Sequence, residues 1–180
     1  MGLTDEAERA EAAADLLHGS PAERARELIA TLSAPREWSA RGLWNLLWLA
    51  GELSTLVDVY CATELLSSVE QLLAGSLRGA AGEMADTAEM AFDFFFNRAP
   101  GESPLASARL DEALHAMARL LAVDGQVCRR AALHGLSHLR QQLEGPPRDR
   151  VDGLIDAFLR ETDSTQLAQY AVRARAGDLL

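Results

Sequence analysis

The sequence predicts an all-α fold in which about eight or nine helices form stacked antiparallel hairpins within a single domain, residues 1–180. Apolar residues recur at helical spacing along almost the whole chain, and alternating strand patterns are almost absent. Apolar residues make up 48% of the 180 residues, which is enough for a sizeable core in one domain. Short breaks rich in proline and glycine separate the helical segments, as is typical of antiparallel neighbours.

The first predicted element is an amphipathic helix rich in alanine and glutamate, which serves as an N-terminal capping helix over 1–19. Thr4 is its expected N-cap, acidic residues occupy the first turn, and His18-Gly19 ends it. The carboxylates between Asp5 and Asp15 line its polar face. We expect either a solvated cap or a helix that docks on a partner.

Residues 21–98 are expected to form divergent hairpins, over 21–50 and 61–98. Ser20 caps the first of these helices and Pro21 occupies its first turn. Its core stripe consists of Ala25, Leu28, Ile29 and Leu32. The next segment carries Trp38, Trp44 and Trp48, and we expect Gly51 to weaken or end its helix.

The middle of the chain leaves one helix boundary open. Residues 53–73 are helical in period and form either one long helix or two short ones, closed at Gly75. A helix over 79–97 follows, and four phenylalanines crowd its end. Its stripe consists of Met84, Ala88, Ala91 and Phe95. The run 98–104 is the clearest interruption in the chain.

Residues 104–177 contain four further helical segments, at 104–123, 127–143, 149–160 and 165–176. A period of 38 to 40 residues relates the last two hairpins. The recurring pairs are Asp124 and Asp163, Val127 and Leu167, and Ala131 and Ala171. A hairpin cannot bury its apolar stripe alone, so this period predicts a stack.

Over residues 110–177 the chain resembles the HEAT-repeat family of α-solenoids. The segment 124–142 carries the resemblance, because an acidic turn residue is followed by valine, arginine and then small or leucine-type residues at helical spacing. The resemblance implies that Asp124 pairs with Arg129 or Arg130 to tie adjacent units together. It also implies a non-enzymatic scaffold that presents an extended surface to a protein partner.

One face of the helix over 127–143 is expected to bind that partner. It consists of Arg130, His134, His138 and Gln141. The core side, roughly opposite, consists of Cys128, Ala132, Gly135, Leu136, Leu139 and Leu143. Both histidines are therefore expected at the surface, so that His134→Ala leaves thermal stability nearly unchanged, whereas Leu136→Asp unfolds the domain.

Two other functions remain open. His134 and His138 lie four residues apart and can share a metal ion, with His115 as third ligand of a helical-bundle metal-dependent enzyme. The aromatic segments can instead enclose a pocket for a small apolar ligand, with Trp38 the most exposed tryptophan, although their spacing is typical of a core. The preferred hypothesis remains a protein-binding scaffold with no metal and no cofactor.

Composition narrows the class of partner. The chain has 17 arginines, no lysine, 27 acidic residues and a net charge of −10, which disfavours nucleic acid and favours a basic or mixed-charge protein. Arginine without lysine is weakly typical of a bacterial sequence. No apolar stretch suits a membrane or a secretory signal. Cys61 and Cys128 match no metal or redox spacing, which favours free thiols in the cytoplasm.

Overall fold

The computed structural model describes residues 19–34, 37–96 and 104–179, and every regular element within these ranges is a helix. Eight of the described helices have seven or more residues. The helices are α2 (Pro21–Ser33), α3 (Ala40–Leu56), α4 (Val59–Ala74), α5 (Glu83–Glu89), the 3₁₀ turn η1 (Met90–Phe92), α6 (Asp93–Phe96), α7 (Pro104–Ala108), α8 (Leu110–Ala122), α9 (Gln126–Gln142), α10 (Pro146–Glu161) and α11 (Thr165–Ala176). The capping helix expected over 1–19 lies outside the described residues.

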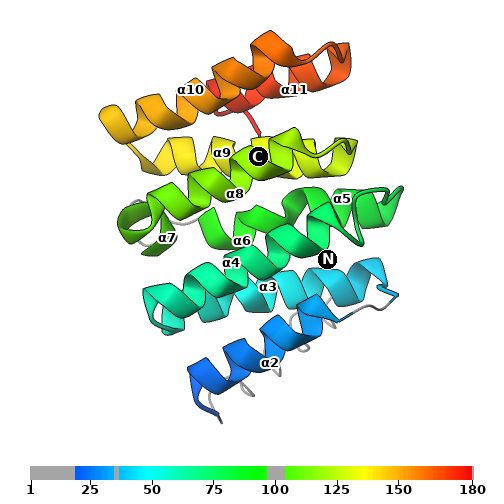
Figure 1. Ribbon diagram of the computed structural model, residues 1–180, viewed down its shortest axis with the longest axis vertical. Coiled ribbons are helices and arrows are strands. Elements are labelled where there is room, and N and C mark those ends of the chain that lie inside the picture. The colour runs from blue at the N-terminus through cyan, green and yellow to red at the C-terminus, as the bar shows by residue number, and fades with distance from the viewer. Residues whose placement is uncertain (1–18, 35–36, 97–103, 180) are drawn as a thin grey trace.

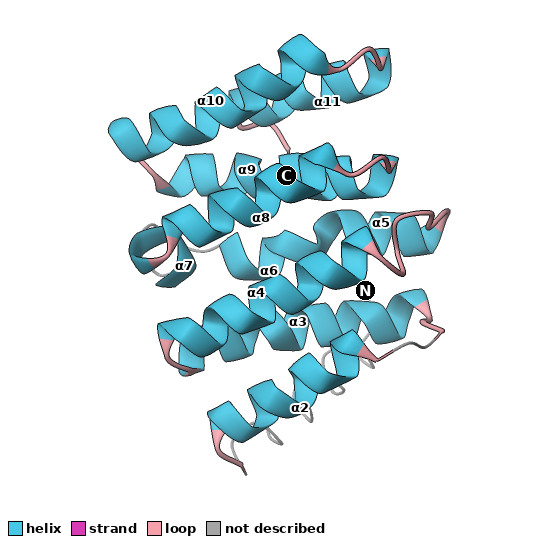
Figure 2. Ribbon diagram, in the orientation of Figure 1, coloured by secondary structure: helices cyan, strands magenta, loops and turns pink. Residues whose placement is uncertain are grey.

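The helices form two layers that follow the order of the chain (Figure 1). One layer contains α2, α4, α8 and α10, and the other contains α3, the α5–η1–α6 segment, α9 and α11 (Figure 2). Within each layer, successive helices contact one another. The connections that lie within the described ranges are short, and α9 lies in the second layer between α5–α6 and α11. None of the described helices is both long and apolar enough to span a lipid bilayer.

An N-cap residue, Asp58, shows where one helix ends and the next begins within 53–73. The side chain of Asp58 accepts hydrogen bonds from the backbone amides of Tyr60 and Cys61, so α4 begins at Val59 and α3 ends at Leu56. Ser39 caps α3 in the same manner. Helix α3 therefore continues through Gly51, where the sequence favoured weakening or an end.

Gly51 serves close packing. A Cβ atom at this position would lie 2.3 Å from the Cβ of Phe94 and 2.4 Å from its carbonyl oxygen. Phe94 also meets the ring of Trp44 edge to face, with 5.0 Å between centroids. The missing side chain thus lets α6 approach α3 at backbone distance.

The helix expected over 79–97 is broken, because α5, η1 and α6 replace it. Its expected stripe still faces inward, since Ala88, Ala91 and Phe95 are buried and Met84 packs against the core. Similarly, the segment 104–123 divides at Arg109 into α7 and α8. Hydrophobic periodicity therefore located the buried faces but not the breaks between helices.

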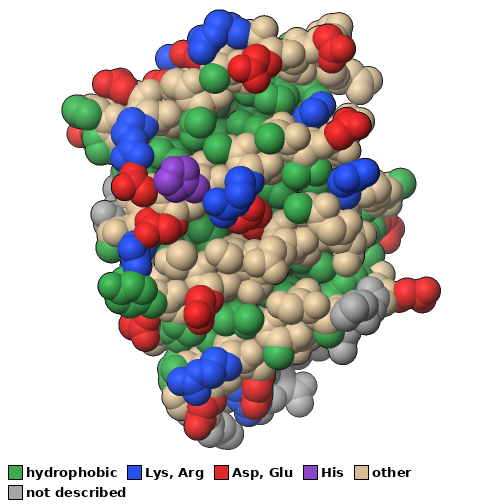
Figure 3. Space-filling view, viewed as in Figure 1, with side chains coloured by type: hydrophobic (Ala, Val, Ile, Leu, Met, Phe, Trp, Pro, Cys, Tyr) green, Lys and Arg blue, Asp and Glu red, His purple; other side chains and the backbone are tan. Residues whose placement is uncertain are grey.

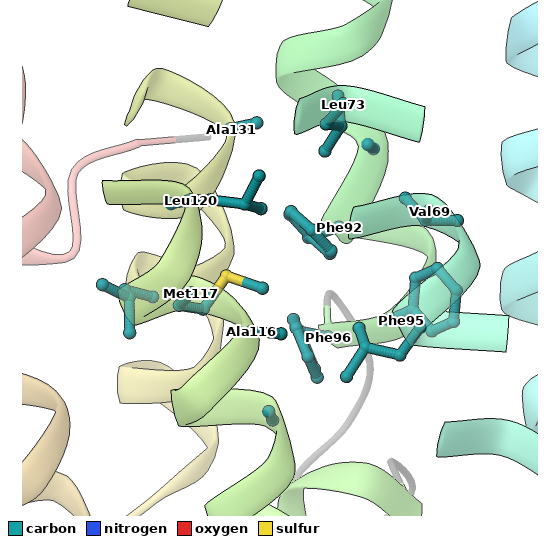
Figure 4. Packing of buried hydrophobic residues seen from close by; sticks show 14 of the residues in the cluster. Val69, Leu73, Phe92, Phe95, Phe96, Ala116, Met117, Leu120 and Ala131 are labelled. Atoms are coloured by element: carbon teal, nitrogen blue, oxygen red, sulfur yellow. The ribbon is translucent and has the colours of Figure 1, made fainter. Parts of the chain in front are cut away.

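Phenylalanines fill the centre of the core between the layers. Phe92, Phe95 and Phe96 are at most 1% exposed, and the rings of Phe92 and Phe96 stack with centroids 6.2 Å apart. Figure 4 shows the surrounding side chains, which include Val69, Leu73, Met117, Leu120 and Ala131. Trp38 is partly buried and packs against the core, so it is less exposed than expected. Cys61 and Cys128 are free thiols.

Candidate metal centre

Helix α9 is covered on several sides at once. It contacts α8 and α10 from one layer and α5, η1, α6 and α11 from its own. As a result, every residue from Ala131 to Leu139 is buried. The expectation that His134 and His138 point to the surface is therefore wrong, since they are 4% and 1% exposed. The face opposite the apolar stripe is not free, because α5–α6 and α11 cover it.

Asp93, the first residue of α6, meets both histidines. Its Oδ1 atom lies 3.2 Å from Nε2 of His134 and 3.2 Å from Nε2 of His138. The two imidazole rings stand side by side, with centroids 5.0 Å apart, because they occupy successive turns of α9. We call Asp93, His134 and His138 the triad. Within the described residues, it is the group of three potential metal ligands whose ligand atoms all lie within 4.8 Å of one another.

The donor atoms of the triad converge without bonding to one another. Oδ1 of Asp93 and Nε2 of each histidine are buried and, among the described residues, none has a hydrogen-bond partner. Unpaired polar atoms in a protein interior are costly, so three at one point need a physical reason. A cation between them is one, because imidazole nitrogens and a carboxylate oxygen can bind it together.

The hydrogen-bond network assigns the tautomer of His134. The Tyr170 hydroxyl donates its single proton to Oε1 of Glu89, and its oxygen lies 3.1 Å from Nδ1 of His134. That oxygen can only accept from the imidazole, so Nδ1 carries the proton. In a neutral ring the lone pair is then on Nε2, which faces Asp93. A second-sphere partner on the other ring nitrogen is typical of metal-binding histidines.

Burial favours the neutral form of this imidazole. Desolvation lowers the pKa of His134; the nearby carboxylate of Asp93 works in the opposite direction, and His138 adds to the lowering. Burial and the hydrogen bond to Glu89 raise the pKa of Tyr170 far above its ordinary value, so the phenol keeps its proton. Neutral imidazole is the form that coordinates a metal ion.

The spacing of the donor atoms suits a transition metal. Nitrogen and oxygen ligands at roughly 2.0–2.1 Å from a tetrahedral zinc ion lie about 3.3 Å from each other. The two measured separations of 3.2 Å agree with that value. Two imidazoles and one carboxylate also form the ligand set of mononuclear zinc and non-haem iron centres.

A second cluster continues along the same face of α9. Arg130 lies one turn before His134, and its Nη2 is 2.8 Å from Oε2 of Glu89 at the end of α5. Its guanidinium also covers the Tyr170 ring at 4.9 Å from the centroid. With neutral imidazoles, Glu89, Asp93 and Arg130 together leave one net negative charge, which favours a cation.

The remaining members of the expected partner-binding stripe have other roles. Gln141 is exposed, and its side-chain amide donates to the carbonyl oxygen of Gly177, just after α11. Arg130 ties α9 to Glu89 of α5 in the same layer. Arg129 is only within 4.0 Å of Asp124, whose side chain is 97% exposed. Asp124 therefore meets Arg129 near the start of α9, and Arg130 pairs with Glu89 instead of Asp124.

His115 does not join the triad. It lies on the exposed side of α8, and its place as third donor is taken by Asp93. Sequence reasoning missed Asp93 because no local spacing relates it to the histidines, 41 and 45 residues later. A usable signal was present, however. Asp93 is the one charged residue within the run Met90–Phe96, which is otherwise apolar and buried or partly buried.

Two pockets lie beside the second cluster and not beside the triad. One, of about 480 Å³, extends from the α4–α5 connection to the start of α9, and the other, of about 260 Å³, lies between α9 and α11. Gln126 and Arg130 line both. Neither pocket is lined by Asp93, His134 or His138.

Comparisons with protein-family models, with curated proteins and with solved structures gave no match to this chain.

Proposed function

We propose that this protein is a helical scaffold that binds one divalent transition-metal ion through Oδ1 of Asp93 and Nε2 of His134 and His138. The observation that carries the proposal is the convergence of these three buried atoms, which have no hydrogen-bond partner among the described residues. The fixed Nδ1 proton of His134 supports it further.

The ion has a structural or regulatory role in this proposal. All three donors are buried, and the two pockets described above are lined by other residues. A hydrolytic metal centre needs an open coordination position that a substrate can reach. The enclosed triad instead links α6 to α9.

Metal analysis of the purified protein tests the site directly. Apoprotein titrated with zinc should bind one ion per chain, and cobalt should give the visible absorption bands of a tetrahedral site. Asp93→Asn should weaken zinc binding at least 100-fold, because a neutral amide replaces the one anionic ligand. Circular dichroism of the variant checks that its helices are retained.

His115→Ala is the matched control, because this histidine is exposed and outside the triad. It should bind zinc like the wild type. Wild-type protein that takes up no zinc or cobalt would overturn the metal site. Equal zinc affinity in wild type and Asp93→Asn would do the same.

We propose that the scaffold is of the HEAT-like α-solenoid type and presents its surface to a protein partner. The order of helices within two layers supports this, because repeat stacks arrange successive hairpins side by side. Acidic and basic side chains interleave over the face formed by α2, α4, α8 and α10 (Figure 3), which fits a partner of mixed charge.

Tyr60, at the start of α4, is the point at which to test partner binding. Its side chain is 69% exposed and lies under the Arg109 guanidinium, 4.4 Å from the ring centroid. Tyrosine and arginine are both enriched among the hot-spot residues of protein interfaces. Affinity purification from the native host should recover a stoichiometric partner with wild type, and less with Tyr60→Ala. Val172→Ala, on the terminal helix α11, is the control. Absence of any stoichiometric partner would contradict the proposal.

A further inference from the structure

We infer that the ion at the triad controls how firmly the N-terminal half of α11 docks on α9. The inference rests on the proposed metal site and adds a regulatory consequence to it. It begins from His134, whose two ring nitrogens face two different parts of the molecule. Nε2 faces Asp93 on α6, and Nδ1 faces Tyr170 on α11.

An imidazole ring is rigid, so fixing one nitrogen aims the other. An ion bound at Nε2 holds the plane of the His134 ring and keeps the Nδ1 proton directed at the Tyr170 oxygen. Across the triad, Nε2 faces the Asp93 carboxylate, with Oδ1 at 3.2 Å, and neither atom has a hydrogen-bond partner among the described residues. Without the ion, no ligand bond fixes the plane of the ring, and rotation of the ring disturbs the contact with Tyr170.

The same tyrosine is held from a third element. Its hydroxyl donates to Glu89 on α5, and Glu89 also binds Arg130 on α9. The ion would thus connect Asp93 to His134, and His134 contacts Tyr170 of α11. Tyr170 in turn binds Glu89, which lies on the same α5–α6 segment as Asp93 and also binds Arg130 of α9. These contacts form a closed ring that includes the ion. Loss of the ion therefore weakens the contacts that Tyr170 of α11 makes with α9 and with α5.

Apolar packing alone holds the first half of α11 weakly. The buried residues of α11 are Leu167, Ala171 and Ala174, and two of these have only a methyl group to bury. Tyr170 is the largest side chain that α11 places between itself and α9. Loss of its hydrogen bonds therefore has a large effect on the docking of this segment.

Other contacts limit the change to this segment. Arg140 of α9 binds Asp152 of α10 at 2.8 Å, and Arg175, near the end of α11, binds Asp152 at 3.0 Å. Gln141 reaches the carbonyl of Gly177 beyond the helix end. These contacts do not involve the triad, so α10 and the C-terminal end of α11 remain attached whether or not the ion is bound.

Hydrogen exchange read by mass spectrometry tests the inference on the full chain. Amides of 168–172, which donate to backbone carbonyl oxygens of the first turns of α11, should exchange at least about tenfold more slowly in zinc-saturated protein than after zinc removal. Amides of α2 and α10 should exchange equally in both. A wild type that binds zinc but shows the same exchange in α11 with and without it overturns the inference and leaves the metal site standing.

Tyr170→Phe separates the coupling from the metal site itself. Because the ligands are intact, it should still bind one zinc ion per chain, with affinity about 10- to 100-fold lower, as expected for loss of a second-sphere partner. Its α11 exchange should no longer respond to zinc. Tyr60→Phe, a remote exposed tyrosine, is the control and should behave like wild type.

Two further results overturn the inference. The first is Tyr170→Phe protein that keeps the full zinc-dependent protection of α11. The second is wild-type protein that binds no zinc in the titration before exchange, which overturns the metal site as well.

Discussion

A single buried imidazole, His134, joins three elements of this protein. Its position in the sequence suggested a surface residue, because it lies opposite the leucines of α9 on a helical wheel. The structure gives it two polar neighbours, Asp93 and Tyr170, and almost no exposure to solvent. A polar stripe on a helix therefore indicates solvent only when no further element covers it.

His134→Ala should lower the free energy of unfolding by about 1–3 kcal/mol, even with zinc removed by a chelator. The substitution leaves a cavity where the His134 side chain is 4% exposed, and it removes the imidazole beside the partly buried Tyr170 hydroxyl. Urea unfolding followed by circular dichroism measures the change. This loss of stability replaces the nearly unchanged stability that was expected for a surface histidine.

The matched control is His115→Ala, which should change stability by no more than about 0.5 kcal/mol because His115 is exposed on α8. Equal stability of wild type and His134→Ala would show that the Tyr170 contact contributes nothing and would count against the buried network.

Glycines have opposite roles in two helices of the stack. In α3, a Cβ at Gly51 would meet both the side chain and the backbone of Phe94. In α10, a Cβ at Gly153 would have nothing within 4 Å, and the residue is exposed. One glycine is needed for helix packing, and the other only weakens its helix.

Gly51→Ala should destabilise the protein by about 1–3 kcal/mol, because α6 must move away from α3 to admit the methyl group. Gly153→Ala should stabilise it by about 0.5–1 kcal/mol through helix propensity. Thermal or urea unfolding of the two variants measures both. A stabilised Gly51→Ala protein would show that α3 and α6 are not in backbone contact.

Several helices were predictable because their ends carry local chemistry. Pro21 was expected in the first turn of α2 and is its first residue, and Ser20 occupies the N-cap position, although its side chain makes no capping hydrogen bond. The predicted segment 165–176 coincides with α11. The break at η1 has no such residue, since Glu89 and Met90 both fit a continuous helix. The phenylalanines pack in the core at that break, and the spacing of apolar residues along one helix does not predict packing of this kind.

Helix α9 is the centre of the whole molecule. Because α8, α10, α5, η1, α6 and α11 all contact it, both layers depend on its position. Sequence periodicity identified its apolar side, including Leu136, which is fully buried. It could not identify the triad, because Asp93 comes from a different element and only the tertiary fold brings it to the histidines.

Leu136→Asp should abolish cooperative unfolding, because a buried unpaired carboxylate costs several kcal/mol against a total stability of about 5–15 kcal/mol. Leu56→Asp is the matched control, since Leu56 is 55% exposed at the end of α3. It should remain folded with a sharp thermal transition. A sharp transition in Leu136→Asp at a similar temperature would show that α9 is not central to the core.

The edge-to-face contact of Trp44 with Phe94 has a spectroscopic consequence. Phe94 follows Asp93 directly, and α6 lies between α3 and α9. The short helix α6 therefore places the proposed ligand Asp93 beside α9, and it places Phe94 against the Trp44 indole of α3. A shift of α6 toward or away from the histidines alters the surroundings of that indole. The fluorescence of Trp44 is therefore expected to change when the proposed site binds a metal ion, so that binding can be followed without an attached dye.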